Sequence, residues 1–166
     1  MAIKQTMHIF GIFLVMLVVG CATGISQQSR SKVTYMGTFS ELQKTPDAYV
    51  SEVVMLGGKI LEIEVSSTSS ELTVLQLALG KSGRPSNLDQ SEGRFLVRSE
   101  QFLDPATYQK GMLLTVVGIL KGSRIRAIGS LGYVYPIVEA IEIKLWPKGI
   151  QTQPTFHFGF GVGTTF

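Results

Sequence analysis

Five segments with the composition of β-strands follow one another between residues 53 and 146, and they constrain the fold more than any other feature of the sequence. Branched aliphatic and aromatic residues dominate these segments, and turn-forming residues separate them, as is typical of a β protein. The predicted strands are Val53–Val65, Leu72–Leu79, Arg94–Arg98, Met112–Lys121 and Tyr133–Trp146. Five strands of this kind can close a small barrel.

The first and longest predicted strand contains Gly57-Gly58, which we interpret as a bulge. A bulge or a glycine kink lets one long strand bend and serve both halves of a barrel. After the glycines, Lys59, Leu61, Ile63 and Val65 alternate with Ile60, Glu62 and Glu64. Because side chains of a strand alternate between its faces, one face is predicted to be largely apolar and the other mainly acidic.

Two short helices are predicted beside the strands. Thr38 is a plausible N-cap with Glu41 at the capping-box position, and Pro46 ends this first helix. Between the third and fourth strands, Asp104 as N-cap and Pro105 at the first helical position indicate a second helix.

Strand, strand, strand, short helix, strand, strand is the order of elements in an OB-fold. The predicted fold is therefore mainly β: a small five-stranded OB-like Greek-key barrel with a short helix between strands 3 and 4 and a short N-terminal helix. A small β-sandwich would use similar strands and is the alternative.

The amino terminus indicates an exported precursor. Lys4 precedes an apolar run from Ile9 to Val19, and this run is shorter than the roughly 18 to 20 residues that span a bilayer. Val18-Val19-Gly20-Cys21 then resembles the lipobox of bacterial lipoproteins, and Cys21 is the only cysteine of the chain. An unpaired cysteine in an exported protein needs a role. The competing interpretation is a buried free cysteine at the end of a core helix.

The lipobox resemblance implies a covalent diacylglycerol and an N-acyl chain on Cys21, with no other cofactor. Ala22, in place of aspartate after the cysteine, implies sorting to the outer membrane, on its periplasmic face. We divide the chain into a signal peptide with lipobox (1–20), a lipidated amino terminus and flexible tether (21–37), the barrel domain (38–148) and a Gly/Phe-rich tail (149–166).

Seven short motifs resemble the Slp family of outer-membrane lipoproteins, in order and in spacing, from Thr38 to Pro147. They are Gly57-Gly58-Lys59-Ile60, Gly83-Arg84-Pro85, Gly93-Arg94-Phe95-Leu96, Phe102-Leu103-Asp104-Pro105, Thr115-Val116-Val117-Gly118, Tyr133-Val134-Tyr135-Pro136 and Leu145-Trp146-Pro147. The resemblance implies a location and a class of protein, and it brings no enzymatic activity with it.

The residue inventory argues against catalysis. After removal of the leader, only His157 and Cys21 remain of the histidines and cysteines, which is too few for a zinc site, so no metal is expected. No G-x-S-x-G elbow, P-loop or dinucleotide motif is present. Paired carboxylates such as Glu62 and Glu64 could serve catalysis, but a solvated strand face explains them more simply. We predict that the protein is not an enzyme.

A basic groove is the predicted binding site. Arg94 and Arg98 share one side of the third strand, and Lys121, Arg124 and Arg126 fall in the expected loop between the fourth and fifth strands. OB-folds bind ligands at this place. The expected partner is an anionic envelope component, such as lipid phosphate, a glycan or an acidic protein surface, and the alternative is an ordinary solvated face. Nucleic acid is disfavoured by a formal charge of only +3.

Two further segments suggest protein contacts. The fourth strand is apolar on both faces, so its outer face needs a cover, which the amino-terminal helix, the tail or a second protein could provide. The tail carries Phe156, Phe158, Phe160 and Phe166 at strand periodicity, and these are the candidate partner contacts. The tail is interpreted as functionally silent, as a strand added to its own barrel or to a partner, or as a membrane-surface anchor.

Two functions follow from the sequence. The first is a non-enzymatic binding or structural module of the envelope. The second is an accessory subunit of a multi-protein outer-membrane or secretion assembly, which would use the tail and the barrel edge for contacts. The oligomeric state stays open.

Overall fold

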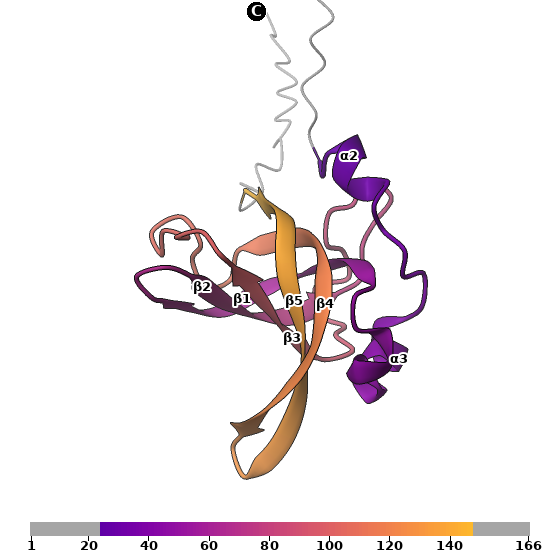
Figure 1. The fold of residues 1–166 in the computed structure, drawn as a ribbon. Coiled ribbons are helices and arrows are strands. Elements are labelled where there is room, and N and C mark those ends of the chain that lie inside the picture. The colour runs from indigo at the N-terminus through magenta and orange to yellow at the C-terminus, as the bar shows by residue number, and fades with distance from the viewer. Residues whose placement is uncertain (1–23, 148–166) are drawn as a thin grey trace, which may run out of the picture.

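A computed structural model describes residues 24–147 of the chain. In these residues three short helical elements precede five strands (Figure 1). The elements are α2 (Gln27–Arg30), α3 (Phe39–Lys44), the 3-10 helix η1 (Pro46–Tyr49), β1 (Val53–Val65), β2 (Ser70–Leu77), β3 (Arg94–Ser99), β4 (Leu113–Ile128) and β5 (Leu131–Trp146).

The five strands form a closed barrel in the order β1-β2-β3-β5-β4, with β4 returning to β1. All pairs are antiparallel except β3 and β5, which run parallel over Leu96–Arg98 and Ile137–Glu139. This strand order is the OB-fold topology. The predicted five-stranded barrel is therefore confirmed, and the sandwich is excluded.

The bend in β1 differs from the prediction. Gly57 and Gly58 pair in register with both β2 and β4, and the irregularity lies further on, between Ile60 and Glu62. The glycines are needed for close approach, because a Cβ on Gly58 would lie 2.3 Å from Cγ1 of Val74. The shift at Leu61 also changes the phase of the strand, so Ile60 is fully buried in the core and does not share the acidic face.

The barrel interior is filled by branched aliphatic side chains around Phe95, which is fully buried. The predicted amino-terminal helix is confirmed as α3, which packs Phe39 against Phe95 with ring centroids 5.9 Å apart. The Thr38 hydroxyl accepts a hydrogen bond from the Glu41 amide at 3.2 Å, and a Glu41 carboxylate oxygen accepts one from the Thr38 amide at 2.9 Å. This capping box begins the helix that covers one end of the core.

The predicted helix between the third and fourth strands is a single turn. The Asp104 carbonyl accepts hydrogen bonds from the amides of Thr107 and Tyr108, both at 2.9 Å, and its side chain caps Ala106 at 2.8 Å. The prediction of a helix is wrong because Gly111, at a φ of +87°, already turns the chain into β4. Its amide donates to the carbonyl of Ile60 at 2.8 Å, which leaves no room for a second turn.

The predicted flexible tether is also wrong for residues 24–37. Ser26 caps α2, and its amide and hydroxyl donate hydrogen bonds to Glu142 of β5 at 2.9 and 2.6 Å. Ile25 is buried. A serine-rich sequence without periodicity can therefore be ordered when its polar groups find partners on the barrel.

The outer face of β4 is covered by the loop after β2. Thr115 is fully buried there, and its hydroxyl donates to the Gly83 carbonyl at 2.6 Å and accepts from Trp146 Nε1 at 2.9 Å. The prediction that the outer face of β4 needs a cover is correct. At Thr115 the cover is this loop, which was not among the three expected candidates.

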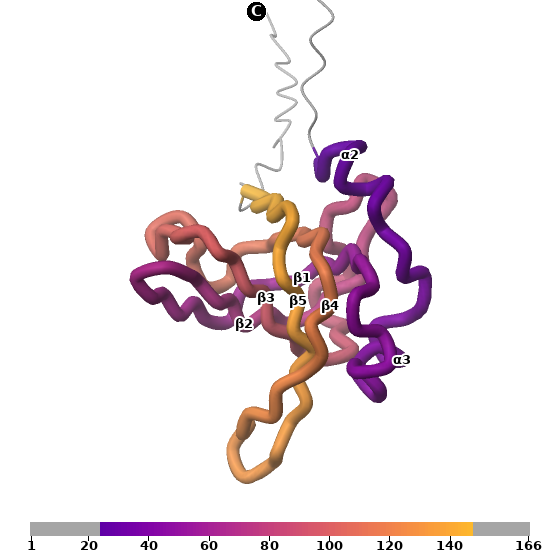
Figure 2. Tube along the Cα trace, viewed as in Figure 1, coloured from indigo at the N-terminus to yellow at the C-terminus, as the bar shows by residue number. Residues whose placement is uncertain are grey.

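Beyond the barrel, β4 and β5 continue as a two-stranded ribbon that points away from α2 (Figures 1 and 2). The ribbon leaves the barrel at a register shift between Leu120 and Ser123, where Gly122 has a φ of +91°. Lys121, Arg124 and Arg126 therefore belong to a strand, and the predicted loop location is wrong. None of the helices in residues 24–147 has the length and apolar character to cross a membrane.

Candidate functional site

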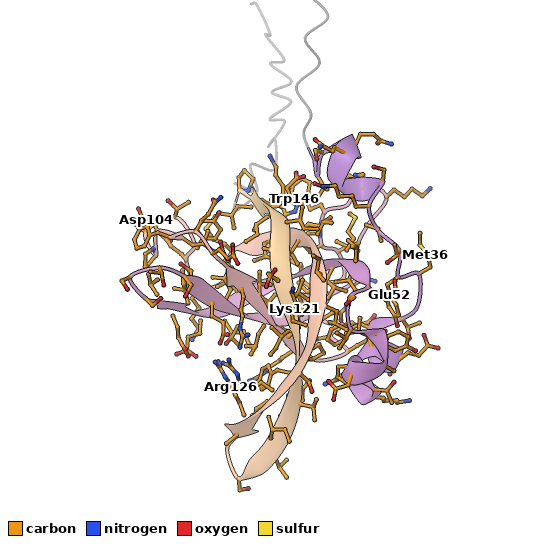
Figure 3. The ribbon with its side chains drawn as sticks, in the orientation of Figure 1. Met36, Glu52, Asp104, Lys121, Arg126 and Trp146 are labelled. Carbon is orange, nitrogen blue, oxygen red and sulfur yellow. The ribbon has the colours of Figure 1, made fainter. Side chains whose placement is uncertain are left out.

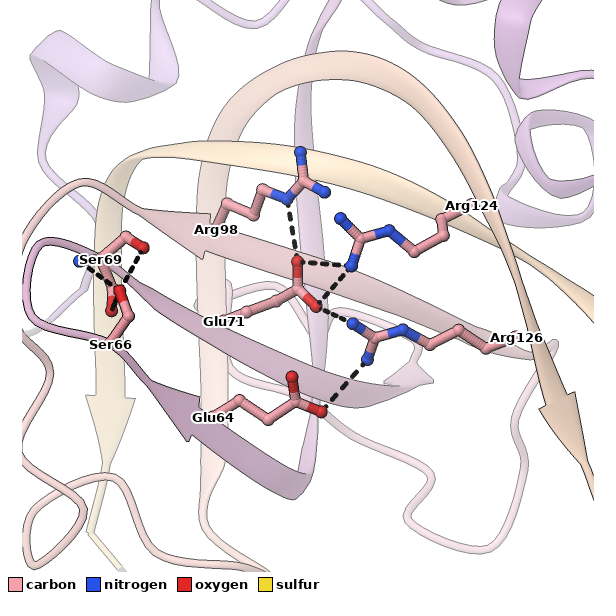
Figure 4. A network of polar contacts seen from close by, with 7 residues as sticks. All are labelled: Glu64, Ser66, Ser69, Glu71, Arg98, Arg124 and Arg126. Atoms are coloured by element: carbon pink, nitrogen blue, oxygen red, sulfur yellow. Dashed lines mark hydrogen bonds and ion pairs between the residues drawn. The ribbon is translucent and has the colours of Figure 1, made fainter.

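Three arginine side chains converge on Glu71 of β2 (Figure 4). Arg98 Nε lies 2.8 Å from Glu71 Oε2, and Arg124 Nη1 lies 3.2 Å from Glu71 Oε1. Arg126 Nη2 forms a third ion pair with the same carboxylate. The Glu71 side chain is 14% exposed, whereas those of Arg98 and Arg124 are 38% and 41% exposed. We refer to these four residues as the arginine cluster.

Strand register and the curvature of the ribbon bring the cluster together. Glu71 is the direct cross-strand partner of Arg98, so the two side chains share the outer face of β2 and β3. On the same face, Leu96, Tyr135 and Ile137 form a second small apolar cluster. This cluster fixes the base of the ribbon against β3, and Arg124 and Arg126 then reach across to β2.

Two cavities border Glu71. One, of about 250 Å³, is lined by Glu64, the Ser66 and Ser69 turn, Glu71 and Arg124. The other, of about 240 Å³, borders Glu71 and residues of β3. Its lining includes Ser70, Arg98, Glu100 and Glu139. Glu64 is 58% exposed and lies 3.6 Å from Arg126 Nη1, so it closes the cluster only loosely.

The structure brings together three of the five predicted groove residues. Arg98, Arg124 and Arg126 form the cluster, and Lys121 pairs with Glu139 at 3.3 Å, on the border of the second cavity. Arg94 lies at the other end of β3, where its amide donates to the Tyr133 hydroxyl at 2.9 Å.

Glu71 is the member that the sequence did not reveal. Its position opposite Arg98 depends on the register between β2 and β3, and the long connection between these strands hides that register. An acidic residue at the start of an apolar strand was the available signal.

The cluster holds more donors than its carboxylates use. Among the described residues, Nη1 and Nη2 of Arg98 have no hydrogen-bond partner, and neither do Nε and Nη2 of Arg124. With Glu64 included, three cations face two carboxylates. A planar guanidinium group is suited to two-point binding of a carboxylate or phosphate. Within residues 24–147, no group of three or more His, Cys, Asp or Glu side chains is placed to hold a metal ion.

The remaining candidate residues lie outside the described residues. Cys21 precedes Gly24, where the description of the structure begins. Phe156, Phe158, Phe160 and Phe166 follow Pro147, where it ends. The predicted lipidation and the predicted tail contacts therefore stay predictions.

The fold and its charged outer face define a small OB-type β-barrel domain. Residues 18–161 match the family described as Outer membrane lipoprotein Slp family, and the chain belongs to this family. The predicted family and the predicted outer-membrane location are confirmed.

Two relatives come from Escherichia coli K12. The uncharacterized lipoprotein YeaY is 28% identical over 136 residues, which cover 82% of this chain and 69% of the relative. The outer membrane protein Slp is 25% identical over 127 residues, which cover 75% of this chain and 67% of the relative.

Among solved structures, a small single-stranded DNA-binding protein from Streptomyces coelicolor is similar over 58% of this chain and 95% of its own. The identity is 14% and the TM-score 0.39. The OB topology assigned above rests on the strand order and not on this likeness.

Proposed function

We propose that the protein is a lipid-anchored, non-catalytic binding module of the outer membrane, acylated at Cys21. Two observations support the anchor: the chain belongs to a family of outer-membrane lipoproteins, and Cys21 lies within the matched residues, at the end of a lipobox-like motif. Each buried methylene contributes roughly 0.8 kcal/mol, so several acyl chains hold a protein on a bilayer in practice permanently.

We propose further that the arginine cluster binds an anionic group of an envelope component. The observation that carries this proposal is the surplus of guanidinium donors around Glu71, beside two cavities and on the barrel face where OB-folds take ligands. Glu71 orients the arginines, but some guanidinium N–H groups of Arg98 and Arg124 have no hydrogen-bond partner among the described residues. An incoming phosphate or carboxylate would meet donors that are already in place.

Titration of the detergent-extracted protein with inorganic phosphate tests the cluster. Arg98→Gln removes two open donors and should weaken phosphate binding about tenfold, because a hydrogen bond to a charged group contributes about 1.5 kcal/mol or more. Arg94→Gln is the matched control, since Arg94 lies on the same strand outside the cluster. Equal affinities of wild type and both variants would contradict the proposal.

Metabolic labelling with radioactive palmitate tests the anchor. Wild type should carry label and sediment with outer membranes. Cys21→Ser should carry none, because a hydroxyl does not replace the thiol in the thioether bond to diacylglycerol. Label that persists in this variant would show that the acyl chains are elsewhere or that the motif is not a lipobox.

The exposed apolar side chains of the ribbon favour a second candidate, an accessory subunit of a larger outer-membrane assembly. Ile125 and Leu131 are 71% and 72% exposed. A shallow cavity of about 550 Å³, lined in part by Pro46, Ile125 and Val134, lies between the ribbon and η1. Contiguous exposed apolar patches are typical of contact surfaces, and these side chains together with the cavity would form such a patch.

A photo-crosslinking residue placed at position 131 in intact cells tests this second candidate. Position 36 is the matched control, because Met36 is 85% exposed and belongs to a different surface. A discrete crosslinked protein at 131 and none at 36 would support an assembly that uses the ribbon. Identical patterns at both positions would contradict it.

A further inference from the structure

Three segments interlock at the end of the barrel where α2 and the end of β5 lie (Figure 1). Residues 24–32, 79–86 and 142–147 are held together by the buried hydrogen bonds of Thr115, by a hydrogen bond from Arg30 Nη2 to the Ser82 carbonyl at 3.2 Å, and by Arg84. The Arg84 guanidinium lies 5.8 Å from the centre of the Trp146 ring and donates to the Pro147 carbonyl at 3.3 Å. We call these three segments the anchor end.

The anchor end is close to the acylation site of the proposed function. Gly24 follows Cys21 by three residues, which reach about 10 Å when fully extended at about 3.5 Å per residue. With the acyl chains of Cys21 in the bilayer, Gly24 must therefore lie within about 10 Å of the acylated residue, and α2 follows Gly24 after two residues. Figure 1 shows α2 and the end of β5 at one end of the molecule and the ribbon at the other.

The charge of the anchor end is strongly asymmetric. Its three segments carry five cationic side chains, which are Arg30, Lys32, Lys81, Arg84 and Lys144. Their single carboxylate is Glu142, which already accepts hydrogen bonds from Ser26. By contrast, the segment 38–52 around α3 and η1 carries three carboxylates and one lysine. The excess positive charge is thus concentrated where the chain approaches the membrane.

We propose that the anchor end binds the phosphate groups of the lipid surface into which Cys21 is acylated. This inference rests on the proposed anchor at Cys21, and it adds an orientation. A lipid tether alone lets the barrel tumble, whereas several cations at the surface hold this end down. The ribbon and Arg126 then point away from the membrane, since Figure 3 shows Arg126 and Trp146 toward opposite ends. The arginine cluster is left accessible from the periplasm.

Co-sedimentation with vesicles tests the proposal on the mature chain, residues 21–166, with Cys21→Ser, so that no acyl chain contributes. The protein should bind vesicles of phosphatidylethanolamine with phosphatidylglycerol more tightly than vesicles of phosphatidylethanolamine alone, and added salt should weaken the binding. Lys32→Gln with Lys81→Gln should weaken it about 25-fold, from about fivefold per cation at an anionic surface.

A control variant makes the test specific. Lys44→Gln with Lys110→Gln removes the same charge elsewhere and should leave vesicle binding unchanged. The proposal is overturned if this lysine control weakens binding as much as the anchor-end variant, or if phosphatidylglycerol adds nothing. The palmitate labelling of Cys21 is a separate measurement, so failure of the anchor is distinguished from failure of this inference.

Discussion

The anchor end and the arginine cluster are both built from polar groups, but they use them in opposite ways. At the anchor end, Thr115 is fully buried and its hydroxyl both donates and accepts a hydrogen bond. In the arginine cluster, half-exposed guanidinium groups share one carboxylate, and some of their N–H donors have no partner among the described residues. Saturated buried hydrogen bonds specify a structure, whereas unsaturated donors at the surface leave a site able to bind. The difference predicts which substitutions change stability and which change binding.

Trp146→Ala should give the largest effect on stability. Trp146 is 8% exposed and its indole joins β5 to Thr115, so truncation should cost about 3 kcal/mol of unfolding free energy. Trp146→Phe keeps the ring packing and loses one hydrogen bond, for about 1 kcal/mol. Urea unfolding measures both, and phosphate affinity should stay at the wild-type value. A loss of phosphate affinity in either variant would show that the two ends are not independent.

Glu71→Gln should give a smaller loss of stability, about 1 kcal/mol, because exposed arginines are screened by solvent. Its effect on binding should have the opposite sign. The substitution removes the competing negative charge and frees donors of three arginines, while the amide oxygen of the glutamine still accepts a hydrogen bond and orients them, so affinity for inorganic phosphate should rise. Urea unfolding and phosphate titration of the same preparation measure the two effects. If stability and phosphate affinity fall together, the cluster is a structural ion network rather than a binding site.

Much of the barrel could be predicted from the sequence, because segments of β-strand composition are separated there by turn-forming residues. The first strand was predicted at the bounds that β1 shows, Val53–Val65. The ribbon was missed because Gly122 and Gly129 resemble loop residues, while backbone pairing of two strands needs no buried side chain. The shift at Leu61 was hidden because Leu61, Ile63 and Val65 alternate regularly with Glu62 and Glu64, so the sequence pattern gives no sign of a change in phase.

The sequence predicted the arginines of the candidate site but did not predict Glu71, on which they converge. Period-two spacing and the OB topology together indicated that Arg98 lies near the residues of the β4–β5 connection. The position of Glu71 depends on long-range register, and the order of residues 24–37 depends on Glu142, a partner more than a hundred positions away. Local patterns contain neither kind of information.

The smallest expected effect concerns the pH dependence of the anchor end. Burial raises the pKa of the Glu142 carboxyl, but hydrogen bonds from Ser26 and Ser29 outweigh it and hold the pKa below its ordinary value of 4.5. A folded-state pKa below the unfolded one means that the contribution to stability is complete above that ordinary value and is lost as pH falls through the folded pKa.

Glu142→Gln should therefore be less stable than wild type at neutral pH, by less than the Trp146→Ala effect, and the difference should vanish in acid. Urea unfolding of both proteins across this range measures it. Glu41→Gln is the matched control, because hydrogen bonds from Thr38 also lower the pKa of Glu41, away from the anchor end. Hydrogen exchange of the α2 amides separates the two carboxyls: acid should release α2 in wild type, and Glu142→Gln should release it at every pH. If α2 stays protected in Glu142→Gln, packing of Ile25 holds this segment and the carboxylate is incidental to the anchor end.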